Sequence, residues 1–315
     1  MPLVLEPSWV GRRITVRRVL RHSPDAPRLG DVVGDLVVLD AEQAVVESRS
    51  GLVEIALGDI AAAKLAPPST RDELDLEEVA AKGWAAAETE WLDGWLLRAD
   101  HGFTRRANTV LPVRQLRRSL DDALRDAHDW YAQRGLPLAF SVPVEGRRLL
   151  DGALAERGWE TGGDNHVMVR RLEAAVRHDP RVTIAAHADD AWFARYREGA
   201  GAEPAARALI TRHDGPVGFA RLVDGDRTVA IGRGVVDDGW LGVAAVEVAP
   251  DVRRRGLAQA VMTALSAWGV AHGARRGYLQ VSADNTAAVA LYRRLGWWVH
   301  HDYRFRTEPR ESRQP

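Results

Sequence analysis

Three consecutive arginines, Arg253, Arg254 and Arg255, are followed at once by Gly256 and by the start of a helical segment. The preceding residues 241–249 form a nearly continuous apolar run, which is typical of a strand covered on both faces. Free backbone N–H groups and the positive end of the helix dipole meet where such a helix begins. A glycine lets a bulky anion approach the backbone closely. The turn therefore predicts a site for a phosphate, and more specifically a diphosphate; the alternative is a solvated basic turn whose glycine serves geometry alone.

The helix after this turn is predicted from apolar residues at i, i+3 and i+4 spacing. These residues are Leu257, Ala260, Val261, Ala264, Leu265 and Trp268. The turn and helix start resemble the acyl-CoA pyrophosphate loop of the GNAT superfamily of N-acyltransferases. The family form Q/R-x-x-G-x-G/A is met by Arg253, Gly256 and Ala258.

A second block of the same family follows at the right distance, over residues 278–298. It contains a strand, then Asn285, then a short helix carrying Tyr292, then Gly296 and an aromatic residue. Both blocks occur in the family's order, so the resemblance covers residues 180–308 well. It implies an acetyl-CoA-dependent N-acetyltransferase, in which a primary amine attacks the thioester directly.

The resemblance also implies a cofactor-binding set. The diphosphate would lie on the turn, and Val246 and Val248 would lie along the acetyl and pantetheine groups, with a strand N–H stabilising the oxyanion. Asn285 would contact the CoA arm, although asparagine is also a good N-cap. The full predicted set is Val246, Val248, Arg253, Arg254, Arg255, Gly256, Leu257, Ala258, Asn285 and Ala288.

Two residues are candidates for catalysis. The family places a general acid for the CoA thiolate where Tyr292 stands; the alternative is a core tyrosine, because apolar residues share its helix face. Glu247 is the candidate general base, since a carboxylate in an apolar strand needs a reason such as a cleft that raises its pKa, or else a salt bridge to a nearby arginine. Some family members carry a base glutamate on the later strand, where this chain has Gln280.

The rest of the chain divides into a β-rich start and a repeat. Residues 1–66 predict a small all-β barrel that resembles SH3-like domains, with a helical turn before its last strand. Residues 67–78 predict a linker. Residues 79–172 predict a degenerate GNAT-like domain and 180–308 the catalytic one, so the expected class is α/β, a mixed sheet flanked by helices, in tandem.

The tandem arrangement is predicted from landmarks that coincide at an offset of 138 residues. The matched pairs are Pro112 with Pro250, Trp130 with Trp268, Gly135 with Gly273, Phe140 with Tyr278, Gly158 with Gly296 and Trp159 with Trp297. At this offset Leu154 replaces Tyr292 and Arg118 replaces Gly256, so the first copy is expected neither to bind CoA normally nor to catalyse. The arrangement is similar to that of mycothiol synthase.

Composition restricts the remaining possibilities. The formal net charge of −1 argues against general attraction to nucleic acid or acidic membranes, and the absence of cysteine excludes disulfides and thiolate nucleophiles. No metal site is expected, because the adjacent His300 and His301 should point to opposite faces of a strand. We expect a cytoplasmic protein, with a homodimer possible. The acceptor stays open between a small-molecule or sugar amine and a lysine or N-terminus of a protein or peptide, and a non-catalytic CoA-binding scaffold is the alternative from another class.

Overall fold

The computed structural model describes residues 5–20, 28–173, 179–197 and 203–309. The chain forms two compact units, an N-terminal unit from Met1 to Ser69 and a C-terminal unit from Thr70 to Pro315. Among the described residues, no helix combines the length and apolar character needed to cross a bilayer.

The N-terminal unit is a five-stranded sheet with strand order β4-β3-β2-β1-β5. Its elements are η1 (Pro7–Trp9), β1 (Arg13–Leu20), β2 (Arg28–Leu39), β3 (Gln43–Ser48), β4 (Gly51–Ala56), η2 (Leu57–Asp59) and β5 (Ile60–Leu65). Neighbouring strands pair in antiparallel fashion, and Ile14, Val16 and Leu36 are fully buried at the centre of its core. The helical turn expected before the last strand is confirmed by η2.

Helix α1 (Thr70–Gly83) begins inside the segment 67–78 that the sequence predicts to be a linker. Acidic residues in its first turn suit the positive end of the helix dipole. Leu76 and Ala80 of α1 are buried in one cluster with residues of the central sheet. The acidic segment is therefore part of a helix with one apolar, buried face, and this helix belongs to the C-terminal unit.

The C-terminal unit is built on a mixed eight-stranded sheet with order β10-β11-β12-β13-β14-β9-β15-β8. The strands are β8 (Ala139–Pro143), β9 (Glu160–Arg171), β10 (Val182–Ala185), β11 (Val217–Asp224), β12 (Arg227–Asp237), β13 (Trp240–Val248), β14 (Arg276–Ser282) and β15 (Trp298–Thr307), with a separate hairpin of β6 (Glu88–Leu92) and β7 (Trp95–Ala99). The helices are α2 (Leu120–Ala132), α3 (Arg148–Glu156), α4 (Asp190–Arg195), α5 (Pro204–Thr211), α6 (Leu257–Ala271) and α7 (Thr286–Arg294), with short 3-10 turns η3 (Arg105–Ala107) and η5 (Pro250–Val252). Of the strand pairs that the structure describes in this sheet, β13–β14 alone is parallel.

The two faces of β12 are covered by different helices. A Cβ added at Gly232 would meet Val261 and Leu265 of α6, and one added at Gly234 would meet Leu265 and Trp268 of the same helix. Arg233, between these glycines, points to the opposite face and donates to the carbonyl of Gly83 at the end of α1. We call this opposite side the α1 face.

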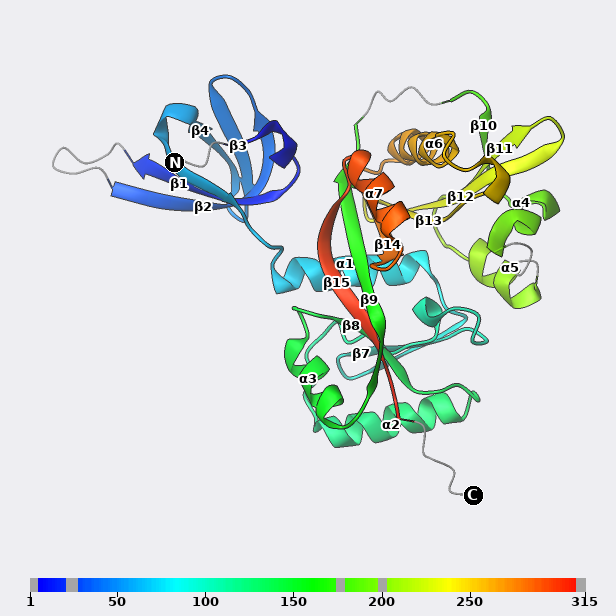
Figure 1. Cartoon of the computed structure of the whole chain (residues 1–315). Coiled ribbons are helices and arrows are strands. Elements are labelled where there is room, and N and C mark those ends of the chain that lie inside the picture. Colours follow the sequence, from blue (N-terminus) through cyan, green and yellow to red (C-terminus); the bar gives the residue numbers. More distant parts are fainter. Residues whose placement is uncertain (1–4, 21–27, 174–178, 198–202, 310–315) are drawn as a thin grey trace. The chain divides into compact units, whose positions relative to one another are not determined.

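The two sequence copies, residues 79–172 and 180–308, share the sheet through an exchange of strands; we call them the first half and the second half. β9, the last strand of the first half, pairs with β14 of the second half, and β15, the last strand of the second half, pairs with β8 of the first. β9 and β15 also pair with each other, and they run side by side through the middle of the unit (Figure 1). The segments 79–172 and 180–308, expected as separate domains, therefore form one body.

The 138-residue equivalence holds for the later elements of each half. The N–H of Trp159 donates to the carbonyl of Leu154, and the N–H of Trp297 donates to that of Tyr292, both at 3.0 Å. Gly158 and Gly296, one residue earlier, have φ values of 78° and 80°. Leu154 therefore occupies the position that Tyr292 occupies in the second half.

Two of the matched pairs do not correspond in space. Val110 bridges to Phe140 in parallel, as Val243 pairs with Leu279 in the second half. Phe140 packs with Trp159, as Leu279 packs with Trp297, whereas Tyr278 lies in the cluster with α1. Phe140 thus corresponds to Leu279 rather than to Tyr278. Val110 then corresponds to Val243, so Pro112 corresponds to Ala245 within β13 and not to Pro250, which follows that strand.

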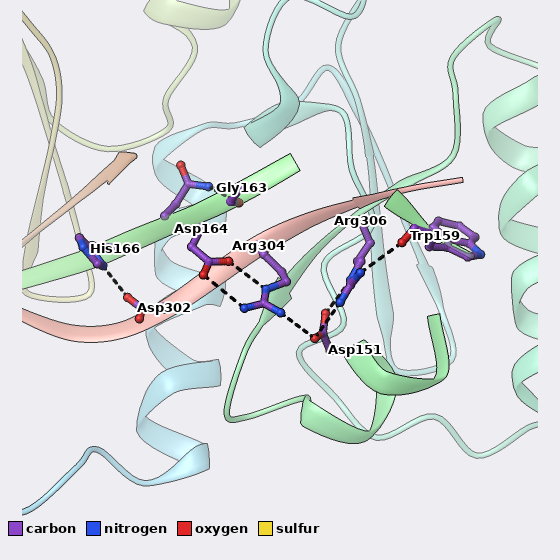
Figure 2. A network of polar contacts seen from close by, with 9 residues as sticks. Asp151, Trp159, Gly163, Asp164, His166, Asp302, Arg304 and Arg306 are labelled. Atoms are coloured by element: carbon purple, nitrogen blue, oxygen red, sulfur yellow. Dashed lines mark hydrogen bonds and ion pairs between the residues drawn. The ribbon is translucent and has the colours of Figure 1, made fainter. Parts of the chain in front are cut away.

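Ion pairs hold the exchanged strand β15 to the first half (Figure 2). Arg306 donates from Nε to Asp151 of α3 at 2.8 Å, and from Nη1 to the carbonyl of Trp159 at 3.1 Å. Arg304 pairs with both Asp151 and Asp164. Arg306 and Asp151 are both buried, so their charges are matched where solvent is largely excluded.

Candidate functional site

The parallel strands β13 and β14 pair at one end and separate at the other. Their pairing runs as far as Val243 and Leu279. Beyond that point β13 carries a bulge, in which Ala245 and Val246 stand opposite Gly232 and Ala245 adopts a φ of 53°. A bulge bends its strand, and beyond it β13 and β14 no longer pair; we call this separation of the two strands the V-shaped opening.

Val248 directs its backbone groups into this opening. The N–H of Ala249 donates to the carbonyl of Val229 at 2.9 Å. Bonded and non-bonded pairs alternate along an antiparallel ladder, so the neighbouring pair of Val248 and Ala230 exchanges no hydrogen bonds. The N–H and C=O of Val248 therefore point away from β12, and Nε of Arg253 donates to that carbonyl at 3.3 Å.

The arginine turn leads into an uncapped helix. Gly256 is the N-cap of α6, with φ 77° and ψ 4°, and no side chain caps the helix. The first intrahelical bond runs from the N–H of Ala260 to the carbonyl of Gly256, so the N–H groups of Leu257, Ala258 and Gln259 have no partner in the helix. A Cβ at Gly256 would meet no atom within 4 Å, so the left-handed conformation, rather than crowding, requires glycine here.

The charges beside this helix start are available to a ligand. Arg253, Arg254 and Arg255 are exposed, and in the described part of the chain Arg254 and Arg255 form no ion pair. Arg254 has a φ of 64°, which turns the chain sharply before the helix. Free N–H groups, the helix dipole and three guanidinium groups can together hold a diphosphate.

The equivalent helix start in the first half is already neutralised. Ser119 caps α2, accepting from the N–H of Asp122 at 3.2 Å and donating to its carboxylate at 2.6 Å. Asp121 adds a second carboxylate to the first turn. Arg118 pairs with Asp126 at 2.7 Å. The first turn of α2 thus carries two carboxylates, and the first turn of α6 carries none.

A cavity of about 470 Å³ lies in the first half, at the start of α3. Two of its three arginines have partners in the fold: Arg114 pairs with Glu78, and Arg147 donates to the carbonyl of Pro112 at 2.6 Å. Burial lowers the pKa of Arg147. These contacts indicate that Arg114 and Arg147 support the fold.

Tyr292 and Asn285 lie on α7, beyond the end of β14. Tyr292 is part-exposed, and the surrounding protein raises the pKa of its hydroxyl to about 12. Its hydroxyl therefore stays protonated at neutral pH and can donate a hydrogen bond. Asn285 caps α7 through Oδ1, which accepts from the N–H of Ala288 at 3.2 Å, and this leaves the amide nitrogen as a donor.

Glu247 lies on the α1 face, next to groups that sequence reasoning did not assign. Its carboxylate accepts from the backbone N–H of Arg197 at 2.9 Å. Burial raises the pKa of Tyr196, and the charges of Arg197, Glu247, Arg106 and Arg233 all act on its hydroxyl. Arg106 comes from the first half, and no motif or spacing in the sequence signals that it reaches this place.

The prediction that His300 and His301 point to opposite faces is wrong. The register of β15 shifts between Val299 and His301, so His300 is the extra residue of a bulge and strand alternation fails there. The two Nδ1 atoms lie 2.8 Å apart, and Nε2 of His301 contacts the buried carboxylate of Glu77 on α1 at 3.0 Å. Among the described residues, no group of three His, Asp or Glu side chains is placed to hold a metal ion.

Comparisons with known proteins agree on one family. The family model described as "Probable histone acetyltransferase Rv0428c C-terminal" matches residues 70–306. The probable histone acetyltransferase Rv0428c of Mycobacterium tuberculosis is 31% identical over 309 residues, which cover 95% of this chain and 96% of the relative. The uncharacterized N-acetyltransferase YobR of Bacillus subtilis is 28% identical over 240 residues, covering 73% and 96%.

A solved structure supports the same fold. A GCN5-related N-acetyltransferase from Kribbella flavida superposes with a TM-score of 0.58 at 18% identity, over 76% of this chain and 96% of that one. The matched family range begins where α1 begins, so it coincides with the C-terminal unit.

Proposed function

Because the chain belongs to the GNAT superfamily of acetyltransferases, in the family of the C-terminal region of Rv0428c, we propose that acetyl-CoA is its donor and a primary amine its acceptor. The observation that carries the proposal is the uncapped start of α6 beside three exposed arginines. The V-shaped opening between β13 and β14 continues from it.

In this proposal the chain holds the donor at two places. Residues 253–258 bind the diphosphate, and Asn285 and Ala288 at the start of α7 flank the CoA arm. Val246 and Val248 line the opening along β13, and the N–H of Val248 stabilises negative charge that develops on the thioester oxygen. Holding the amine against the thioester supplies much of the acceleration.

Glu247 is proposed as the group that takes a proton from the acceptor. An alkyl ammonium has a pKa of about 10.4 and cannot attack until it is deprotonated. Glu247 lies on the α1 face, on the opposite side of the sheet from α6, so it can receive that proton directly or through water.

Tyr292 is proposed to stabilise the departing thiolate. The departing thiolate needs a proton, and the hydroxyl of Tyr292 carries one at neutral pH. Tyr292 is therefore the proposed general acid that protonates the thiolate, and the proton lost by the amine balances the one that Tyr292 gives up.

The wider organisation is also proposed rather than established. The strand order of the N-terminal unit supports an SH3-like small barrel, and the repeated helices and strands support a tandem GNAT arrangement like that of mycothiol synthase, in a cytoplasmic protein. A sugar amine is one alternative acceptor. A lysine or N-terminus of a protein or peptide is another, supported by the name of the Mycobacterium tuberculosis relative. The alternative to an enzyme is a non-catalytic CoA-binding scaffold. For the oligomeric state, we propose a homodimer.

Calorimetric titration of acetyl-CoA into the full chain tests the donor site. We expect one site per chain, because the start of α2 is capped and acidic. Two sites would show that the first half also binds the donor. The absence of binding would refute the acetyl-CoA proposal.

A further inference from the structure

Arg106 of the first half reaches the opening between β13 and β14. It belongs to the short turn η3. Its Nη2 donates to the main-chain carbonyl of Gln280 at 3.4 Å, and its Nε donates to the hydroxyl of Tyr303 at 3.1 Å. Gln280 follows Leu279, the last residue of β14 that pairs with β13. The guanidinium group therefore lies where the strands separate.

Arg106 approaches from the α1 face. Tyr303 is buried in one cluster with Leu76 and Ala80 of α1. The α6 helix, whose N-terminus carries the proposed diphosphate site, covers the opposite face of β12. An acceptor that enters from the α1 face would thus meet Arg106 on its way to the thioester.

The surroundings of Arg106 carry more positive than negative charge. The Tyr196 hydroxyl senses three guanidinium groups, those of Arg106, Arg197 and Arg233, and one carboxylate, that of Glu247. Arg197 is positioned by packing over the ring of Phe103, 4.8 Å from its centre. Guanidinium groups therefore outnumber carboxylates among the charges that act on this hydroxyl.

Two of these arginines lack an acidic partner within the described ranges. Arg233 is only 1% exposed and donates to two main-chain carbonyls, of Gly83 at 2.7 Å and of Arg212 at 3.4 Å. Its Nε is buried without a hydrogen-bond partner. Arg106 likewise donates only to a carbonyl and a phenol. Arg233 is thus a buried cation without a matching anion, which is costly, and the part-exposed Arg106 can bind an anionic ligand beside it.

We propose that the acceptor is an amine that carries a carboxylate, of the amino-acid class, and that Arg106 binds this carboxylate. This inference rests on the proposed function. Guanidinium and carboxylate groups match in charge and in planar geometry. Glu247 then faces the amine, while the positive cluster favours its neutral, nucleophilic form. A simple diamine would bring only positive charge into the same place.

The test compares acceptors that differ only in the carboxylate. Full-length protein is assayed with acetyl-CoA and with natural amino acids, each paired with its decarboxylated amine, such as lysine with cadaverine. We expect at least one amino acid to exceed its amine in kcat/KM by about 10- to 100-fold, the range for a charge-assisted hydrogen bond. Arg106→Gln should remove that preference mainly through KM, and Arg106→Lys should restore part of it.

Arg105→Gln provides a matched control, because Arg105 is the exposed neighbour in the same turn and packs over the ring of Phe305 instead. The control should keep the preference. Affinity for acetyl-CoA and the melting temperature of Arg106→Gln should match those of the parent.

Three results would overturn the inference. They are equal use of amines and amino acids in every pair, turnover of protein or peptide lysine alone, and no turnover of any acceptor while acetyl-CoA still binds. If the parent protein does not bind acetyl-CoA, the proposed function itself is refuted.

Discussion

A carboxylate placed at Gln259 should weaken CoA binding without destabilising the protein. Gln259 is exposed and is the third residue of α6, where an N–H group is free for a ligand. In the first half, the third residue of α2 is Asp122, which helps to neutralise that helix start. Gln259→Asp therefore copies one feature of the first half into the second.

The magnitude follows from Coulomb's law. A carboxylate about 6 Å from a phosphate, at an effective dielectric of about 20 to 40, repels it by about 1 to 3 kcal/mol. This corresponds to a dissociation constant about 10- to 100-fold higher. An acidic residue in the first turn also stabilises a helix by about 0.3 to 1 kcal/mol. Affinity and stability should thus change in opposite directions.

Calorimetric titration with acetyl-CoA at low and at high ionic strength measures the first effect, and urea denaturation the second. The penalty should shrink at high salt, because exposed charges are screened over a Debye length of about 10 Å at 0.1 M and about 3 Å at 1 M. Gln259→Asn is the neutral control and should bind like the parent. An unchanged dissociation constant for Gln259→Asp at low salt would show that the diphosphate does not lie at α6.

Further substitutions address catalysis and packing. Tyr292→Phe should lower kcat by at least about 10-fold with unchanged affinity for acetyl-CoA, and an unaltered kcat would exclude the hydroxyl from the reaction. Burial raises the pKa of Tyr292 above its ordinary value of 10 to about 12, so the fold favours the neutral hydroxyl. This contribution to the free energy of unfolding is complete below pH 10 and is lost as the pH rises to 12. In urea denaturation, the free energy of unfolding of Tyr292→Phe should therefore decline less than that of the parent across this range. Gly83→Ala should destabilise by about 1 to 3 kcal/mol because its Cβ meets the hydroxyl of Tyr278, and adding Tyr278→Phe should restore most of the loss; two independent, additive effects in denaturation would contradict this contact. Glu77→Gln should cost about 1 to 3 kcal/mol of unfolding free energy, since it weakens a buried contact with His301, and a change below about 0.5 kcal/mol would disprove its structural importance.

The features that could be predicted from the sequence are local ones. The arginine turn, the glycine at the helix start and the helix stripe lie within 16 consecutive residues, so backbone geometry and spacing determine them together. The equivalence of Leu154 and Tyr292 also follows from short-range order, because each helix ends in the same glycine and tryptophan pattern. Arg106 could not be found this way, because its contact with Gln280 spans 174 positions and no motif marks it.

The exchange of β9 and β15 could not be predicted from the hydrophobic periodicity of the sequence, for a different reason. An apolar pattern shows that a strand has a buried face, but it does not identify which neighbour pairs with that strand. The choice of neighbour depends on side chains that are compatible with one another. Arg306 forms an ion pair with Asp151 in the first half. Their equivalents in the second half, Met168 and Val289, lie in one apolar cluster. Without exchange, Arg306 would face Val289 and Asp151 would face Met168, leaving two charges buried without partners.

The exchange also sets an order for folding during synthesis. β8 and β9 leave the ribosome well before β14 and β15, so the first half is complete in sequence while both strands still lack their final neighbours. An unpaired strand edge is a template for wrong pairing, and contacts across such long separations form slowly. The nascent first half must therefore remain an incomplete intermediate until residue 307 has been made. Neither half could be inherited or exchanged between genes by itself without leaving the other with an open edge.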